Sequence, residues 1–277
     1  MKNVLARIVT GSACLAITIG FFVWDLHFES KFGLLILGCV LVCGALHEFY
    51  DLAGLEYAPR GLRRAGVLLA ALYLARRCVE PADAASLPVA LGLTLAAGFI
   101  LHVREAGFDG VRDSVFPLVA GFVYLPLMVG HAFDIRHAWG LKTLLAVALI
   151  TKASDMAGWL FGNLIGGKKL APKISPNKTW SGFLGGLVGC CLMALLMRGL
   201  SLIGELSVAR LIALALVLGV AGPLSDLAES ALKRDAGVKD SGSVLRVAGG
   251  FLDLIDSLVF ALPAGYYFLY LCGLPGK

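Results

Sequence analysis

Two pairs of carboxylates frame the most polar segment of an otherwise apolar chain. Asp226 and Glu229 form one pair, and Asp253 and Asp256 form the other, each with a spacing of three residues. In a helix, residues three apart share a face, so each pair presents two carboxylates on one side. Such charges are costly in an apolar setting unless cations or metal ions neutralise them. The two pairs therefore indicate a site that attracts cations.

Basic residues lie between the two acidic pairs. Lys233, Arg234 and Lys239 follow the first pair, and Asp240 adds another acid. The transition state of phosphoryl or nucleotidyl transfer spreads negative charge over phosphate oxygens. Carboxylates that hold Mg²⁺, together with Lys and Arg side chains, can neutralise that charge. The segment therefore predicts phosphoryl- or nucleotidyl-transfer chemistry.

The elements that must position these residues are membrane-spanning helices. Of the 277 residues, 58% are apolar and 16% are charged, whereas a soluble domain carries about 25% charged residues. The mean hydropathy is +0.84. Apolar runs recur from end to end without a polar linker, so we expect a single integral membrane domain over 1–277. Within it, N-terminal helices would occupy 1–140 and catalytic helices 141–277.

The apolar runs predict an all-α, polytopic bundle of about nine spans. A helix rises about 1.5 Å per residue, so roughly 20 residues cross the hydrocarbon core. The nine expected spans are 4–24, 32–50, 64–79, 86–103, 114–132, 140–164, 181–203, 208–227 and 251–273.

The basic residues between the spans predict the orientation, because Lys and Arg are enriched in cytoplasmic loops. Nine spans would place the N-terminus and the polar stretches 166–180 and 228–250 in the cytoplasm, where nucleotides are. We expect a multi-pass protein of a bacterial inner or plasma membrane. The basic residues that fall on this side are Lys2, Arg7, Arg60, Arg63, Arg64, Lys168, Lys169, Lys173, Lys178, Lys233, Arg234, Lys239 and Arg246.

The net charge and the spacing of glycines indicate which partners the protein can contact. The formal net charge of +5 is small and dispersed, which argues against nucleic acid and suits contact with anionic lipid headgroups. Gly158 with Gly162, and Gly182 with Gly186, have the spacing that lets helix backbones approach closely in lipid. This spacing predicts tight helix packing, and it leaves a homodimer open.

Two stretches resemble the phosphatidate cytidylyltransferase family. The first matches the family signature within 222–257, including the preceding Ser225–Ser230. The second covers Asp155–Gly162 and Lys169–Trp180, and Arg7–Gly11 and Glu48–Ala53 are also similar to the family. The resemblance covers essentially the whole chain and is sharpest over 151–257. The matched signature positions are Ser230, Lys233, Arg234, Lys239, Asp240, Gly249, Gly250, Asp253 and Asp256.

The resemblance implies a reaction and roles for the matched residues. A phosphatidate oxygen would attack the α-phosphorus of CTP, forming CDP-diacylglycerol while pyrophosphate leaves, with Mg²⁺ as cofactor and a second metal ion left open. The implied catalytic residues are the metal ligands Asp226, Asp240, Asp253 and Asp256, together with Lys239. The implied substrate-binding residues are Lys233, Arg234, Glu229, Ser230, Lys173, Ser175, Lys178, Thr179 and Asp155.

Departures from the family pattern keep alternatives open. The chain has Arg246-Val247-Ala248 where the family usually has Pro-Gly-His, and Leu254 where it usually has Arg. A related transferase of altered nucleotide or lipid specificity is therefore one alternative, and an inactive lipid-binding homologue is another. Asp155 inside an apolar run also allows a transporter's ion site. The simplest alternative for Asp226 and Glu229 is a solvated helix end.

Overall fold

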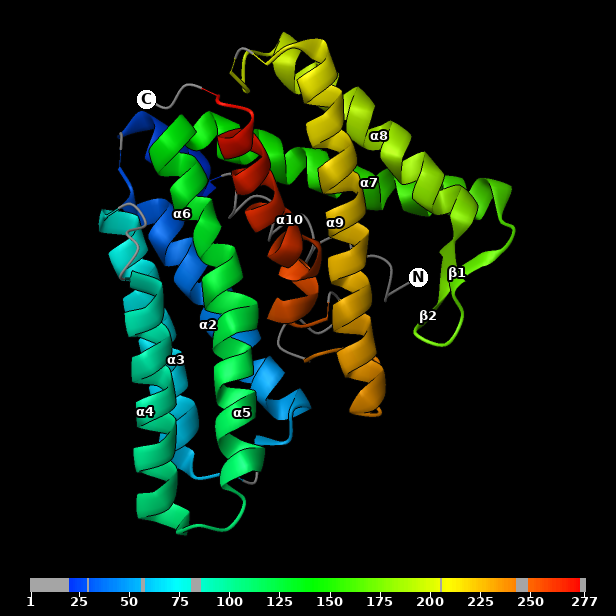
Figure 1. Ribbon diagram of the computed structural model, residues 1–277. Coiled ribbons are helices and arrows are strands. Elements are labelled where there is room, and N and C mark those ends of the chain that lie inside the picture. Colours follow the sequence, from blue (N-terminus) through cyan, green and yellow to red (C-terminus); the bar gives the residue numbers. More distant parts are fainter. Residues whose placement is uncertain are drawn as a thin grey trace. The chain divides into compact units, whose positions relative to one another are not determined.

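The computed structural model describes residues 20–28, 30–55, 58–80, 86–204, 206–242 and 249–274. Apart from one short hairpin, the regular structure within these residues is helical (Figure 1). Residues 20–27 are also helical. The elements are α2 (Phe32–Leu52), α3 (Arg60–Val79), α4 (Ser86–Ala106), α5 (Val111–Phe122), the π-helical turn η2 (Val123–Leu127), α6 (Met128–Trp139), α7 (Leu141–Ile165), β1 (Lys169–Ala171), β2 (Ser175–Thr179), α8 (Trp180–Gly199), α9 (Val208–Asp235) and α10 (Phe251–Leu271).

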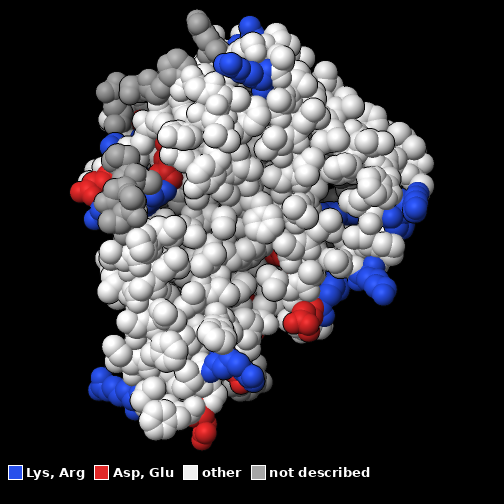
Figure 2. Space-filling view, viewed as in Figure 1, with Lys and Arg blue, Asp and Glu red and all other residues white. Residues whose placement is uncertain are grey.

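Within the described residues, seven helical segments are long and apolar enough to cross a membrane. One of them, Val111–Trp139, combines α5, η2 and α6. Uncharged side chains cover most of the face in Figure 2, and Lys, Arg, Asp and Glu gather at a few places. The prediction of an all-helical, multi-pass protein is therefore confirmed. The other six segments are Phe32–Leu52, Ser86–Ala106, Leu141–Ile165, Trp180–Gly199, Val208–Asp235 and Phe251–Leu271.

Two of the nine predicted spans are not among these seven segments. The first, at 4–24, lies largely outside the described residues. The third, at 64–79, does form helix α3, but arginines stand close to both of its ends. The apolar stretch between them, 65–75, would extend only about 16 Å as a helix, roughly half the thickness of the hydrocarbon core. Hence α3 is a helix of the fold but not a candidate span by itself.

The chain divides into two compact units. The first comprises residues 1–130 and 235–255, and the second comprises residues 131–234 and 256–277. Within the first unit, α2, α3 and α5 pack around Tyr50, which is fully buried. A side chain at Gly66 in α3 or at Gly121 in α5 would collide with the Tyr50 ring or hydroxyl group. The tyrosine hydroxyl donates to the carbonyl of Leu118 at 3.4 Å.

In the second unit, α7 and α8 pack through the glycines whose spacing predicted close contact. A Cβ atom built on Gly182 would lie 2.6 Å from the carbonyl oxygen of Gly158 and 3.2 Å from the Cα atom of Gly162. One built on Gly186 would lie 2.9 Å from the hydroxyl group of Ser154. Only hydrogen at these positions allows the two backbones to approach this closely. The glycine spacing therefore correctly predicted a tight helix pair.

A β-hairpin connects α7 to α8 within a stretch that the sequence indicated only as a polar loop (Figure 1). Gly166 and Gly167 follow α7 with φ angles of 66° and 101°, a region that glycine adopts without strain. The strands β1 and β2 then pair antiparallel. At the end of β2, the hydroxyl oxygen of Thr179 accepts a hydrogen bond from the Gly182 amide at 3.1 Å and so caps α8.

Candidate active site

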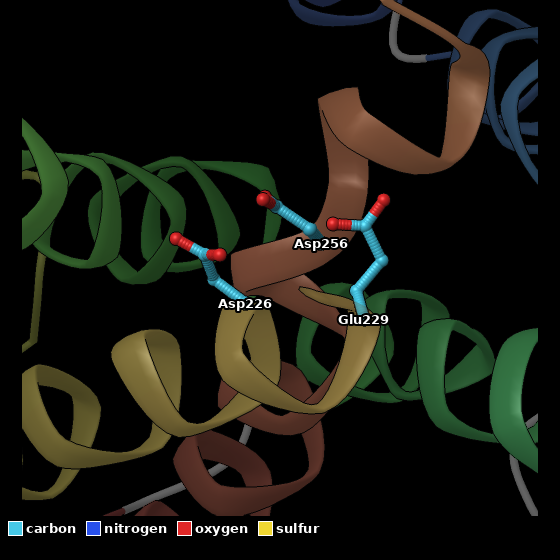
Figure 3. Close-up of side chains that lie close together, drawn as sticks. All are labelled: Asp226, Glu229 and Asp256. Atoms are coloured by element: carbon cyan, nitrogen blue, oxygen red, sulfur yellow. The ribbon is translucent and has the colours of Figure 1, made fainter. Parts of the chain in front are cut away.

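Three carboxylates from two helices come together in the second unit. Asp226 and Glu229 belong to α9 and Asp256 belongs to α10 (Figure 3). Each offers an oxygen atom, and these atoms lie within 4.8 Å of one another. Glu229 is fully buried, whereas Asp226 and Asp256 are partly exposed. We call these three residues the acidic cluster. It unites two of the four predicted metal ligands with Glu229, which the sequence assigned to substrate binding.

A lysine stands beside each carboxylate of the acidic cluster. Lys178 comes from β2, Lys233 from α9 and Lys152 from α7, so three elements of the second unit supply the compensating charge. A buried or half-buried carboxylate needs such a partner, because removal from water penalises its charged form. The N–O distances are 2.7 Å for Lys178 and Asp226, 2.8 Å for Lys233 and Glu229, and 3.7 Å for Lys152 and Asp256.

Lys152 is a site residue that the sequence analysis missed. Its ammonium group donates to the Ser257 hydroxyl at 2.8 Å and lies 3.8 Å from a carboxylate oxygen of Asp155 and 3.7 Å from one of Asp256. Lys152 therefore links α7 to the start of α10 in this unit. A lysine inside an apolar run is costly without a partner, and that cost was the signal that could have identified it.

Two serine hydroxyls of α9 stabilise the acidic cluster. The Ser225 hydroxyl donates to the backbone carbonyl of Asp256 and accepts from the Phe260 amide at 3.2 Å. Ser230, a predicted substrate-binding residue, instead donates to a carboxylate oxygen of Asp226 at 3.3 Å. Both serines are buried, so their hydrogen bonds help to fix the positions of Asp226 and Asp256.

A cavity of about 530 Å³ opens beside the acidic cluster. Its volume lies within the range of about 300–1,000 Å³ that is typical of small-molecule sites. Its walls combine polar residues with apolar side chains such as Trp159 and Phe183. A cavity of this kind suits a molecule with a charged head and an apolar body. Five predicted site residues contribute to its lining, namely Asp155, Ser175, Lys178, Thr179 and Asp226.

Four other predicted site residues are exposed, two assigned to substrate binding (Lys173 and Arg234) and two to catalysis (Lys239 and Asp240). Lys173 lies in the hairpin turn, and Lys239 and Asp240 follow the end of α9. Arg234, near the end of α9, is exposed as well, and its guanidinium donates to the carbonyl of Ile174 at 3.3 Å. These four residues present charge to the surroundings of the protein, so their roles in substrate binding and catalysis stay predictions.

Asp253 has a different environment from the acidic cluster. It belongs to the first unit, where its oxygen Oδ2 accepts hydrogen bonds from the Gly250 amide at 2.7 Å, the Ser241 amide at 3.2 Å and the Ser241 hydroxyl at 2.9 Å. Its role as a metal ligand, like that of Asp240, stays a prediction. The departure at 246–248, including Arg246, lies outside the described residues.

The acidic cluster fits a divalent cation by the chemistry of its donors. All three side chains end in carboxylates, and oxygen is the ligand that Mg²⁺ selects. The cluster draws on two helices, whose packing fixes the spacing of the oxygens. The lysines around the cluster show that its negative charge already requires compensation, which a metal ion would also provide.

Comparison with known proteins agrees with this chemistry. Residues 5–272 match the family described as "Cytidylyltransferase family". The chain is 32% identical over 239 residues to "Uncharacterized protein YnbB" of Escherichia coli, covering 82% of this chain and 76% of that protein. It is 38% identical over 161 residues to "Phosphatidate cytidylyltransferase" of Haemophilus influenzae, covering 57% of this chain and 55% of the enzyme.

A third relative extends the comparison. The chain is 36% identical over 163 residues to "Phosphatidate cytidylyltransferase" of Bacillus subtilis, which covers 57% of this chain and 60% of that enzyme. The chain thus spans somewhat more than half the length of these two enzymes. The family match, by contrast, runs over nearly the whole of its 277 residues. The chain belongs to the cytidylyltransferase family.

Proposed function

We propose that this protein transfers the cytidylyl group of CTP to phosphatidate, forming CDP-diacylglycerol and pyrophosphate. The observation that carries the proposal is the acidic cluster, with its three lysines, beside a cavity that has both polar and apolar walls. Relatives named phosphatidate cytidylyltransferase support the choice of substrates. A site among membrane-spanning helices suits a reaction whose lipid substrate and lipid product both stay in the bilayer.

The residues of the site have distinct tasks in this reaction. Asp226, Glu229 and Asp256 would hold Mg²⁺, which supplies positive charge to phosphate oxygens when it is bound. Lys178 lines the cavity and carries an ammonium group to its wall. Thr179 and Ser175, also in the lining, can donate hydroxyl hydrogen bonds to phosphate oxygens. Asp240 and Asp253 are further proposed ligands of the metal.

The covalent change needs little beyond positioning and charge. An oxygen of the phosphatidate phosphate forms a bond to the α-phosphorus of CTP, and the bond from that phosphorus to the bridging oxygen breaks. Pyrophosphate leaves with the electron pair. Lys173, Arg234 and Lys239 are proposed to hold the triphosphate from the cytoplasmic side, where CTP is present. Cationic side chains lower the barrier because they neutralise charge that develops on the leaving group.

The test is direct measurement of the reaction. Purified protein in detergent or liposomes is supplied with radiolabelled CTP, phosphatidate and Mg²⁺, and CDP-diacylglycerol is resolved by thin-layer chromatography. We expect product that depends on all three components. A suitable control is the variant Asp113→Asn, because Asp113 is exposed and forms an ion pair with its neighbour Arg112. Absence of product from folded wild-type protein would overturn the assignment.

A related transferase with altered specificity is the second candidate. It is favoured by Arg246-Val247-Ala248 and Leu254, which replace the usual family residues, and by the 32% identity with YnbB over most of the chain. The same assay separates the two candidates if CTP is exchanged for UTP, ATP or GTP, and phosphatidate for other lipid phosphates. Product that forms only with an exchanged nucleotide or an exchanged lipid phosphate would favour the second candidate. Lipid binding without product would favour an inactive homologue.

A further inference from the structure

A buried glutamate from α2 binds the beginning of α10 within the first unit. Glu48 has only 5% of its surface exposed. Its oxygen Oε1 accepts from the Phe251 amide at 3.0 Å, and Oε2 accepts from the Leu252 amide at 2.9 Å and from the Ser241 hydroxyl at 3.0 Å. One side chain therefore joins α2 to the signature segment, about 200 residues away in sequence.

The physical reason for this contact is the start of the helix. The first amides of a helix have no partner within the helix, and the helix dipole places partial positive charge there. A carboxylate is therefore well matched to these donors. Glu48 satisfies the amides of Phe251 and Leu252, while Asp253 satisfies the amide of Gly250. Together the two acids provide partners for three successive backbone donors.

The neighbouring glycines make room for the Glu48 side chain. A Cβ atom on Gly250 would meet Glu48 Oε2, and one on Gly242 would meet the same carboxylate group. One turn before Glu48, a Cβ atom on Gly44 would lie 2.5 Å from the Phe251 ring. Gly44 and Glu48 are four apart, so they share one face of α2. That face fits the beginning of α10 in both shape and charge.

We propose that Glu48 is a positioning residue for the transfer reaction. By holding the first turn of α10, it keeps the helix intact up to its second turn, which carries Asp256. The proposal rests on the proposed function, because it assigns Asp256 to the reacting site. A displacement of reacting groups by about 1 Å can cost a factor of about 100 in rate. We call the contacts of Glu48 with the Phe251 and Leu252 amides the clamp. Loss of the clamp should therefore lower turnover.

The first experiment compares Glu48→Gln with Asp51→Asn. Both substitutions replace one acid of α2 by its amide, but Asp51 is exposed and pairs with Arg63. We expect Glu48→Gln to lower kcat between about 10- and 100-fold while KM for CTP changes by less than about twofold, since the Glu48 carboxylate is buried against backbone amides. Hydrogen exchange at the amides of Phe251 and Leu252 should become faster. Asp51→Asn should leave kcat and exchange at their wild-type values.

The second experiment tests whether Glu48 is the reason for glycine at position 250. Gly250→Ala alone should lower kcat and accelerate exchange in the first turn of α10, because the new methyl group meets the Glu48 carboxylate and the Ser241 hydroxyl. Combined with Glu48→Ala, the same substitution should cost at least about threefold less, since the Glu48 carboxylate is gone and only the Ser241 hydroxyl still meets the methyl group. A double-mutant cycle on kcat and on the free energy of unfolding measures this coupling.

Two results would overturn the proposal. One is a Glu48→Gln protein with wild-type kcat and wild-type exchange at Phe251 and Leu252. The other is strict additivity of Glu48→Ala and Gly250→Ala in both measures. Hydrogen exchange and unfolding need no substrate, so they test the clamp even if the wild-type protein fails to convert CTP and phosphatidate. Normal clamp behaviour without that reaction would reject the proposed function and, with it, the role of Glu48 in catalysis.

Discussion

Each of the two units contains carboxylates removed from water, but the groups that compensate their negative charge differ between the units. In the acidic cluster, lysine side chains from β2, α7 and α9 face the carboxylates. At the start of α10, backbone amides and the Ser241 hydroxyl face Glu48 and Asp253. A lysine can swing toward another anion at little cost, whereas a backbone amide moves only if its helix unwinds. The first arrangement suits exchange of ligands, and the second suits a fixed joint.

This difference separates two roles that sequence spacing alone presents as equal. Asp253 and Asp256 are three apart on α10, yet Asp253 falls in the first turn, where amides need partners, and Asp256 falls beyond it. The first-turn position explains why Asp253 binds the Gly250 amide. Asp256, one turn later, finds a lysine instead. The position of an acid relative to the helix start thus decides how it is neutralised.

The largest expected effect comes from Asp256→Asn, which removes a charge from the acidic cluster. We expect turnover to fall by about 100- to 1,000-fold, the usual cost of losing one group that stabilises transition-state charge. Folding should be retained, because the asparagine side chain has nearly the same shape. Turnover by the radiolabel assay and thermal unfolding in detergent check both points, with Asp113→Asn as control. Wild-type turnover in Asp256→Asn would show that the acidic cluster takes no part in the reaction.

A moderate effect on stability is expected from Asp253→Asn. An amide cannot replace the charged acceptor of three hydrogen bonds, so the free energy of unfolding should fall by about 1–3 kcal/mol. The decisive measurement is the stabilisation of the variant by added Mn²⁺ or Mg²⁺. Loss of that stabilisation would support Asp253 as a metal ligand. Stabilisation equal to that of the wild type would mean that Asp253 only accepts hydrogen bonds at the start of α10 and does not bind metal. The two regions would then differ more clearly in function.

The smallest expected effect concerns Lys152→Met. Without its ammonium group, Asp155 and Asp256 lose a neighbouring positive charge, so a divalent cation should bind about fivefold more tightly, corresponding to about 1 kcal/mol for charges some 4 Å apart in a water-like dielectric. Mn²⁺ binding followed by electron paramagnetic resonance measures the change. Lys142→Met is the matched control, since Lys142 is exposed on the same helix. Weaker binding in Lys152→Met would show that the lysine supports the cluster rather than competing for it.

Much of the fold was predictable because apolar run length and glycine spacing are local properties. The seven candidate spans and the contact of Gly182 with Gly158 follow from such patterns. The pairing of Asp226 with Glu229 on one helix face was equally accessible. The prediction that 64–79 spans the membrane gave too little weight to the arginines at both ends of α3. The 11 apolar residues between them form a helix but are too few to cross the lipid.

The remaining features depend on contacts between residues far apart in the chain. No local pattern identified Lys152 as the partner of Asp256 or Glu48 as the partner of Phe251, because each pair is separated by more than 100 residues. The hairpin was missed because its strands contain only 3 and 5 residues, too few to show alternation. Sequence thus located the chemistry, whereas tertiary packing determined which acids share it.

The pairing of β1 with β2 has a practical consequence for experiments on topology. Lys169 lies opposite Thr179 and Ala171 lies opposite Ser175. The pairing of the two strands, rather than the loop that joins them, therefore fixes the position of Lys178 along the hairpin. Pro172 and Lys173 at that tip are exposed and can accommodate an inserted epitope or protease site without shifting the strands. Cleavage of such an insert in sealed, oriented vesicles would report which side of the membrane the hairpin faces.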